Sequence, residues 1–193
     1  MYYIMKCPKL CNSAGEVYTE IHNSFRIAGI RLWTNGQPLP DDKKKEIPNP
    51  IEILFDVFRG YNGPPREYTD TGIPVMSKRL RDTLSSLGVD NIDFFPTILT
   101  NSSTAETYPY YAYKIVGLVS LADMQKSEFV TYRNSAPVID VSFQKLVFDH
   151  SKGRGQLLFR LAESTSTIVV HETVKQGIEK AGINTIEFFE PES

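Results

Sequence analysis

The chain has 193 residues, of which 41% are hydrophobic and 11% aromatic, enough to bury one ample core or two small cores that share an interface. Its net charge of −2 excludes a general electrostatic attraction to nucleic acid or to an anionic membrane. The opening sequence MYYIMKCPKLC lacks the apolar stretch of a secretory signal, and no apolar run reaches the roughly 18 residues of a membrane span, so we expect a cytoplasmic protein.

The two cysteines, Cys7 and Cys11, are too few for a disulfide framework, and we expect them to be reduced thiols. His22 is the nearest histidine, and three candidate ligands on one unanchored segment are a weak basis for a zinc site. The sequence therefore predicts neither a metal nor another cofactor.

The first predicted element is a strand over residues 24–34, SFRIAGIRLWT, with apolar side chains on both faces. The turn pair Asn35-Gly36 closes it. Residues 37–50 contain four prolines and a run of charges, which predicts an exposed connector rather than a helix or a strand.

The remaining elements follow a plan that occurs twice. The first set is a strand over 51–58, a Gly/Pro-rich loop over 59–72, an extended piece over 73–76, a helix over 77–87, a strand over 92–95, and longer strands over 110–121 and 137–148. The second set is a strand over 156–162, an extended piece over 167–170, a helix over 171–181 and a closing strand over 185–189.

This order predicts an α+β fold of two related strand-helix-strand modules, with a mostly antiparallel sheet and helices packed on the sheet. The expected divisions are residues 1–50 for the N-terminal strands and the connector, 51–148 for the first module with the long strands, and 149–193 for the second module. We expect these parts to form one compact unit.

The two modules also share a sequence pattern. GVDNIDFF at residues 88–95 returns as GINTIEFF at 182–189, and each glycine follows a helix at the point where a C-cap needs a left-handed conformation. No identical residue is a nucleophile, acid, base or ligand, and the shared acidic position Asp93/Glu187 is expected to face solvent, which indicates a copied scaffold rather than a copied active site. The identical pairs are Val75/Val169, Gly88/Gly182, Ile92/Ile186, Phe94/Phe188 and Phe95/Phe189, and the aligned apolar stripes are Met76, Leu80, Leu84, Leu87 and Val170, Val174, Ile178, Ala181.

Acid–base catalysis needs a titrating group beside a partner that tunes it. His150 follows Asp149 in a Gly-rich turn, and His171 begins a predicted helix. Glu163 lies near Arg160 on a predicted strand, where an ordinary ion pair explains both residues equally well. The sequence contains no Ser-His-Asp order, nucleophile elbow or phosphate loop. An enzyme of unassigned class that uses His150, His171 or Glu163 therefore stays an alternative, and a non-enzymatic protein is favoured.

The modules differ in one loop. Phe58 precedes Ile73 by 15 positions, whereas Ala162 precedes Thr167 by 5, so the first module has 10 extra residues. Loops of this length in compact proteins are often functional, and Tyr and Arg are enriched at binding hot spots. The alternative is that this loop and the tyrosine-containing loop after the first module are neutral surface. We predict partner-binding residues in the two loops at Arg59, Tyr61, Arg66, Tyr68, Tyr108 and Tyr110.

Three segments, IPVMSKRLRDTL, LLFRLAESTSTIVVHETVKQGIEKAGI and IEFFEP, resemble in this order a bacterial family of immunity proteins, family eleven of the polymorphic toxin systems. The match is best over residues 51–193, and FRLAES followed by an extended piece, a helix ending in Ala-Gly and a strand is its most specific part. The resemblance implies a bacterial cytoplasmic protein that binds a cognate toxin domain and blocks it, and the family defines no catalytic residues. A self-associating structural protein is the further alternative.

Overall fold

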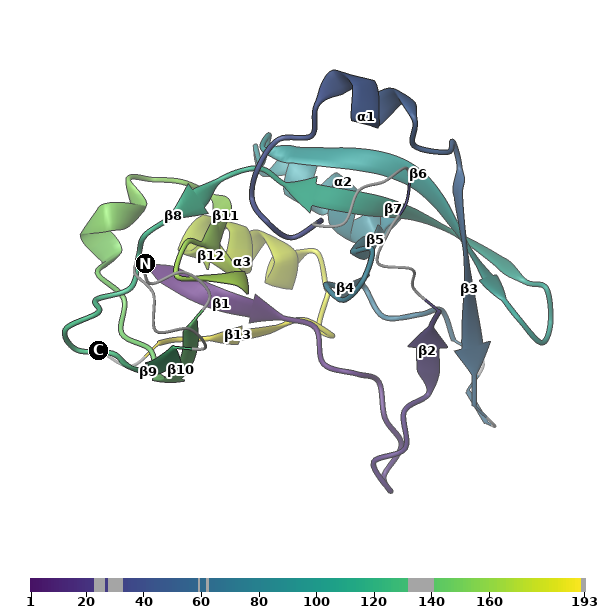
Figure 1. The fold of residues 1–193 in the computed structure, drawn as a ribbon. Helices are drawn as coiled ribbons and strands as arrows, with labels where there is room; N and C mark the ends of the chain where they lie inside the picture. The colour runs from purple at the N-terminus through teal and green to yellow at the C-terminus, as the bar shows by residue number, and fades with distance from the viewer. Residues whose placement is uncertain (23–26, 28–32, 59, 62, 132–140, 192–193) are drawn as a thin grey trace.

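The structure is a computed structural model that describes residues 1–22, 27, 33–58, 60–61, 63–131 and 141–191. Most of the strand expected over 24–34, the beginning of the one expected over 137–148, and Arg59 lie outside the described residues. The described chain is mostly β-sheet with helices packed beside the sheets, in agreement with the expected α+β class (Figure 1).

The larger sheet has six strands, and short strands form both of its edges. Neighbouring strands are antiparallel except β3 and β6, which are parallel because the chain crosses through a helix between them. In spatial order the strands are β2 (Thr19–Ile21), β3 (Ile51–Val57), β6 (Ile92–Asn101), β7 (Thr107–Ile115), β5 (Val75–Ser77) and β4 (Tyr68–Thr69).

The smaller sheet joins the first residues of the chain to the last ones. Tyr2 lies opposite His171 and Met5 lies opposite Ile168, so β1 is antiparallel to β12, and β13 pairs with the other edge of β1. The spatial order is β13 (Glu187–Phe189), β1 (Tyr2–Lys6), β12 (Ser164–His171), β11 (Leu158–Leu161) and β8 (Leu118–Val119), while β9 (Glu128–Thr131) and β10 (Val141–Lys145) form a separate two-stranded sheet.

The two predicted helices are confirmed as α2 (Lys78–Ser86) and α3 (Glu172–Lys180), 94 positions apart at both ends. The side chains of Ser77 and His171 each accept a hydrogen bond from the backbone of the first turn that follows, which makes them the N-caps. Gly88 and Gly182 follow the helices with φ of 83° and 70°, a conformation that glycine adopts without a side-chain clash. A single 3₁₀ turn, η1 (His150–Gly153), occupies the predicted Gly-rich turn.

The segment 37–50 contains a short helix, α1 (Asp41–Lys45), so the expectation of a connector without secondary structure was wrong there. Asp41 and Asp42 lie in its first turn and lysines fill its last turn, an arrangement that suits the helix dipole and that the charge run concealed. None of the helix residues is buried, so the segment is exposed as expected.

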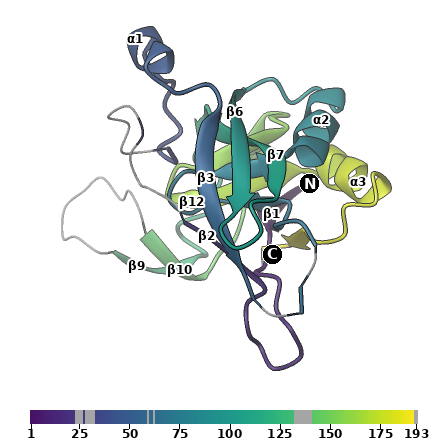
Figure 2. The same cartoon turned by 90° about the vertical axis from the view of Figure 1, so that its right-hand side faces the viewer.

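One hydrophobic core is shared by the two larger sheets and the two longer helices. Figure 2 shows α2 and α3 side by side. Leu80 and Leu84 of α2 and Val174 and Ile178 of α3 are completely buried, and side chains of β1, β5, β7 and β12 pack against them. The sheets are therefore held together through the helices rather than through a linker.

The strands around the two helices pair in the same register. In each sheet, a strand that precedes the helix and a strand that follows it both pair with one antiparallel strand between them, which is β7 in the larger sheet and β1 in the smaller one. The sequences of these middle strands correspond, YYIMK at residues 2–6 and YYAYK at 110–114. The paired triplets are Val75–Ala112–Phe95 and Val169–Ile4–Phe189.

A cation lies over two aromatic rings at corresponding places on the two helices. The two cations, Arg81 and Lys175, are 94 positions apart in the sequence, and so are Phe94 and Phe188, one ring of each group. The other rings, Tyr111 and Tyr3, belong to the YY pairs of the middle strands. The groups are Arg81 over Tyr111 and Phe94, at 4.5 and 5.7 Å from the ring centroids, and Lys175 over Tyr3 and Phe188, at 5.3 and 5.9 Å.

Some strands differ in extent from the predictions. The strand expected over 110–121 is divided by Val116 and Gly117, whose φ is 131°, where the chain passes from the larger sheet into β8 of the smaller one. The strand expected over 92–95 continues to Asn101 because β7 and β3 pair with it on both sides. The strands β2, β4 and β9 are too short to show a period in the sequence.

Candidate partner-binding site

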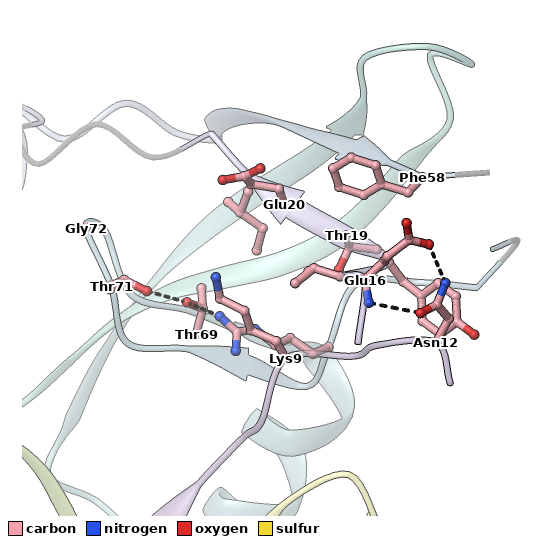
Figure 3. A pocket seen from close by; sticks show the side chains of 13 residues that line it. Lys9, Asn12, Glu16, Thr19, Glu20, Phe58, Thr69, Thr71 and Gly72 are labelled. Atoms are coloured by element: carbon pink, nitrogen blue, oxygen red, sulfur yellow. Dashed lines mark hydrogen bonds between the residues drawn. The ribbon is translucent and has the colours of Figure 1, made fainter. Parts of the chain in front are cut away.

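A pocket of about 810 Å³ lies between the two edges of the larger sheet (Figure 3). One wall consists of edge strand β2 and the residues before it, and the other includes Thr69 of edge strand β4 and the turn at Thr71 and Gly72. The sheet therefore curls so that its two edges face one opening. Pockets of this size accept a small ligand or a segment of a partner protein.

A tight turn supports the wall that contains β2. The side-chain oxygen of Asn12 accepts hydrogen bonds from the backbone N–H of Ala14 and of Glu16, both at 2.9 Å, and its amide nitrogen donates to the Glu16 carboxylate at 2.7 Å. Gly15 in this turn has φ of 79°. The backbone N–H of Tyr18 then donates to the Leu10 carbonyl oxygen, so both arms of the turn are joined just before β2 begins.

The backbone of β2 is bonded to β3 on one edge. Phe58 N–H donates to the Tyr18 carbonyl oxygen at 2.9 Å, and His22 N–H donates to that of Leu54 at 2.8 Å. In an antiparallel pair, the backbone groups of alternate residues point to opposite edges of the strand. The N–H and C=O groups of Thr19 and Ile21 therefore point away from β3, toward the other edge of β2.

The opposite wall carries basic and hydroxyl groups. The Arg66 guanidinium donates to the Cys7 carbonyl oxygen at 2.9 Å and to the Thr69 hydroxyl at 3.0 Å, which fixes its position. The hydroxyls of Thr69 and Thr71 are 3.0 Å apart. Lys9 extends between the two walls (Figure 3), and within the described part of the chain no ion pair neutralises either Lys9 or Arg66. The wall thus has the charge and the donors that bind a carboxylate.

Aromatic side chains surround the outer end of the pocket. The rings of Tyr18 and Tyr61 are stacked, with centroids 4.8 Å apart, and the Tyr61 hydroxyl donates to the Pro64 carbonyl oxygen at 2.6 Å. Burial, with a smaller effect of Tyr18, raises the pKa of Tyr61. Phe58, which follows β3, is 48% exposed, and Leu54 of β3 is 51% exposed, so both offer apolar surface to a partner.

The structure separates the predicted partner-binding residues into two groups. Arg66 lines the pocket and Tyr61 reaches its rim through the Tyr18 stack. Tyr68 and Tyr110 are 4% and 5% exposed, and their hydroxyls donate to backbone carbonyl oxygens at 2.9 and 2.7 Å. Tyr108 packs edge-on against Phe55, and Arg59 lies outside the described residues. The buried tyrosines therefore anchor the loop from inside.

Sequence reasoning missed four residues that line the pocket: Lys9, Tyr18 and Glu20, which β2 and the segment before it bring there, and Phe58, which follows β3. A signal was present in Asn12-Ser-Ala-Gly15, a typical turn sequence between short extended pieces. Nothing in the sequence indicates that this turn faces residues 66–72, because that proximity arises from the curl of the sheet.

The residues of the enzyme alternative do not form one cluster. The His150 ring nitrogen Nδ1 accepts from the Tyr2 backbone N–H at 3.2 Å, and the His150 and His171 rings both contact the Tyr2 ring. Burial is the main cause that lowers the pKa of His150. Glu163 is 7% exposed and precedes β12, at the opposite end of that strand from His171.

The sequence suggested that Arg160 could form an ion pair with Glu163, but Arg160 has another partner. Its guanidinium instead binds the carboxylate of Asp70, from the larger sheet, through two hydrogen bonds. Arg160 is completely buried, and Tyr113 donates a hydrogen bond to the same carboxylate at 2.9 Å. Sequence reasoning could not pair residues 90 positions apart, so this partner was not predicted.

Cys7 and Cys11 are free thiols, and burial raises the pKa of Cys7. Within the described residues, no three His, Cys, Asp or Glu side chains come together in a way that could hold a metal ion. Among the helices of the same residues, none has the length and apolar character that crossing a bilayer requires.

Comparison with known proteins gives one clear result. The sequence model of the immunity protein family (Imm11) matches residues 13–192, which is most of the chain. No curated protein matches the sequence.

Proposed function

Because the chain belongs to the immunity protein family (Imm11), we propose that it binds a cognate bacterial toxin domain and neutralises it by occlusion, without catalysis. Membership of this family is the observation that carries the proposal. Occlusion needs a complementary surface, about 1,600 Å² in total for a standard interface, with aromatic or arginine anchors near its centre. It needs no reactive group. The proposal places the protein in the bacterial cytoplasm, with a protein rather than nucleic acid or a membrane as its partner.

The roles of the candidate catalytic residues support a non-catalytic function. His171 is the N-cap of α3, and His150 accepts a hydrogen bond from the first strand. Glu163 lies at the far end of β12 from His171, and Arg160 is engaged by Asp70. These contacts give His150, His171 and Arg160 structural roles, so no reactive function is needed to explain the presence of these three side chains.

The proposal includes a relationship between the two halves of the fold. Matching helix bounds, caps and strand registers support two related β-α-β units, in which the middle strand comes from β7 in one unit and from β1 in the other. Their common residues serve cores, caps and registers. The pocket lies beside residues 59–72, where the first unit has its extra loop. The proposal therefore assigns toxin binding to the extra loop, which distinguishes the first unit from the second.

The proposed interface is centred on this pocket and its rim. Tyr18 and Tyr61 offer a rigid stacked pair, Phe58 and Leu54 offer exposed apolar surface, and Arg66 offers a fixed guanidinium. These are the residue types that serve as anchors at protein interfaces. Tyr68 and Tyr110 support the interface from the core rather than contacting the toxin.

The direct test is co-expression with the toxin domain encoded by the adjacent reading frame. We expect growth to be restored and the two proteins to co-purify as a complex. Titration of the toxin activity with purified protein separates occlusion from catalysis, because occlusion requires one equivalent of the protein per toxin. Variants His150→Ala, His171→Ala and Glu163→Gln should neutralise as well as the parent does when they are folded. Lack of both protection and complex would contradict the proposal, and inactivation of the toxin at a small fraction of an equivalent would indicate an enzyme.

A further inference from the structure

Resting on the proposed function, we infer that the toxin presents an extended segment that adds as a strand to the outer edge of β2, with a carboxylate of that segment bound by Lys9 and Arg66. The occupant of the pocket is then an acidic stretch of polypeptide rather than a helix or a small molecule. Three features carry this inference: the edge geometry, the shape of the opening, and the distribution of charge.

The edge geometry provides a template for a strand. Within the described residues, β3 is the one strand that pairs with β2, and β2 ends the order of strands in its sheet. Thr19 and Ile21 direct their N–H and C=O groups away from β3, whereas the neighbouring Glu20 faces Asp56 of β3. An edge with regularly spaced donors and acceptors is a ready site for another strand.

The opening is shaped for one such segment. It is bounded by the edges of one curled sheet, with β2 on one side and Thr69 of β4 with the Thr71–Gly72 turn on the other. A volume of about 810 Å³ is large enough for a segment of an extended chain. A strand placed there would continue the sheet from β2 toward β4 and would pair with the N–H and C=O groups of β2 that point away from β3.

The positive charges of the pocket favour a particular type of side chain on the toxin segment. Lys9 and Arg66 both line the pocket, and among the described residues neither forms an ion pair. On the wall that contains β2, the Glu16 carboxylate accepts a hydrogen bond from the Asn12 amide. Figure 3 shows the Glu20 carboxylate turned away from Lys9. Lys9 and Arg66, the latter held beside the Thr69 hydroxyl, are cations that an acidic residue of the added strand could pair with directly.

The test uses the purified toxin domain encoded by the adjacent reading frame and residue-resolved amide hydrogen exchange of the protein, free and in complex. Strand addition should slow exchange at Thr19 and Ile21 by at least about a hundredfold, because their N–H groups gain partners. Glu20 is the internal control, since its N–H faces β3 in both states. In a separate binding measurement with the same toxin domain, Lys9→Glu should weaken binding by about tenfold or more. Lys126→Glu, a matched charge reversal at an exposed position, should change the affinity by less than about twofold.

The outcomes separate this inference from the function on which it rests. A complex in which Thr19 and Ile21 exchange as in the free protein would overturn strand addition and leave toxin neutralisation standing. Full affinity of Lys9→Glu would overturn the carboxylate contact. If no complex forms, both the function and this inference fail.

Discussion

The guanidinium of Arg160 and the carboxylate of Asp70 form a two-bond ion pair, with N···O distances of 2.6 and 2.8 Å, between the smaller and the larger sheet. Arg160 is completely buried, and Asp70 is mostly so, which places both charges away from water. Removing one partner of a buried pair leaves the other charge uncompensated, at a cost of about 3–5 kcal/mol. The two sheets therefore depend on each other at this contact.

We predict that Asp70→Asn lowers the free energy of unfolding by about 3–5 kcal/mol, measured by urea denaturation. Asp82→Asn, which breaks an exposed pair with Lys78, should leave the free energy of unfolding almost unchanged. Combining Asp70→Leu with Arg160→Met removes both charges and should recover most of the loss. An Asp70→Asn protein as stable as the parent would show that the pair is not needed.

The buried Lys114 predicts a dependence of stability on pH. Burial, with a smaller effect of the positive Arg160, lowers the pKa of Lys114 to about 8, and its ammonium donates to the Asn35 side-chain oxygen at 2.6 Å. An unfolded lysine has a pKa of about 10.4. Between these values the unfolded chain binds a proton that the folded protein has released, so this group makes stability rise with pH.

The measurement compares the parent with Lys114→Met by urea denaturation from about pH 7.5 to 9.5. The stability of the parent relative to the variant should rise by up to about 1.4 kcal/mol per pH unit in this window. The difference is the useful quantity, because burial also raises the pKa of Cys7 and of Tyr68, and these groups act in the opposite direction in both proteins. Parallel pH profiles would contradict the prediction.

The contact between α2 and α3 requires a glycine. A Cβ atom on Gly177 of α3 would lie 2.4 Å from both δ carbons of Leu87, which follows α2. Alanine is favoured over glycine inside a helix by about 1 kcal/mol, but here the clash should exceed that gain. We predict that Gly177→Ala lowers the free energy of unfolding by about 1–3 kcal/mol, whereas Gln176→Ala at the neighbouring exposed position leaves it within about 0.5 kcal/mol.

The double variant with Leu87→Ala provides the check on the mechanism. Shortening Leu87 makes room for the new methyl group, so the two changes should cost less together than the sum of the single costs. Strict additivity would mean that Gly177→Ala acts through something other than Leu87.

The tyrosines of the extra loop should respond differently to truncation. Tyr61 is half-buried at the rim of the pocket, so Tyr61→Ala should weaken toxin binding by about tenfold or more and leave the fold intact. Tyr68 is buried, so Tyr68→Ala should lower the free energy of unfolding by about 3–5 kcal/mol. Calorimetric titration and urea denaturation measure the two effects.

Phe189→Ala is the matched control for Tyr61→Ala, since Phe189 is 42% exposed on β13 of the smaller sheet, away from the pocket. Its affinity for the toxin should equal that of the parent. A Tyr61→Ala protein that binds with unchanged affinity would place the interface elsewhere.

Local sequence signals were sufficient for the two longer helices. Ser77, the apolar stripe and Gly88 are read from neighbouring residues, and their counterparts around α3 are read in the same way, so both helices were predicted nearly to the residue. The middle strand of the smaller sheet was not assigned to that sheet, because Tyr2 meets His171 only in the folded chain. The similarity of YYIMK to YYAYK was the available signal.

The candidate site was predicted in part for the same reason. The composition of the extra loop pointed to Tyr61 and Arg66, which do lie at the pocket. Composition cannot distinguish them from Tyr68, since tyrosine is common both at interfaces and in cores. Lys9 lies between β1 and β2 in the chain, and only tertiary structure brings it to the pocket that Arg66 also lines.

The position of β1 also determines the order in which the protein can be completed. β1 is synthesised before the other strands of the described residues, yet both of its neighbours, β12 and β13, lie near the C-terminal end of those residues. The edge that pairs with β12 has no partner until residue 171 is made, and the edge that pairs with β13 has none until residue 189. Closing loops of this length carries an entropic cost before any pairing repays it. The smaller sheet is therefore completed only after translation of its C-terminal strands, and β1 is paired long after it is made.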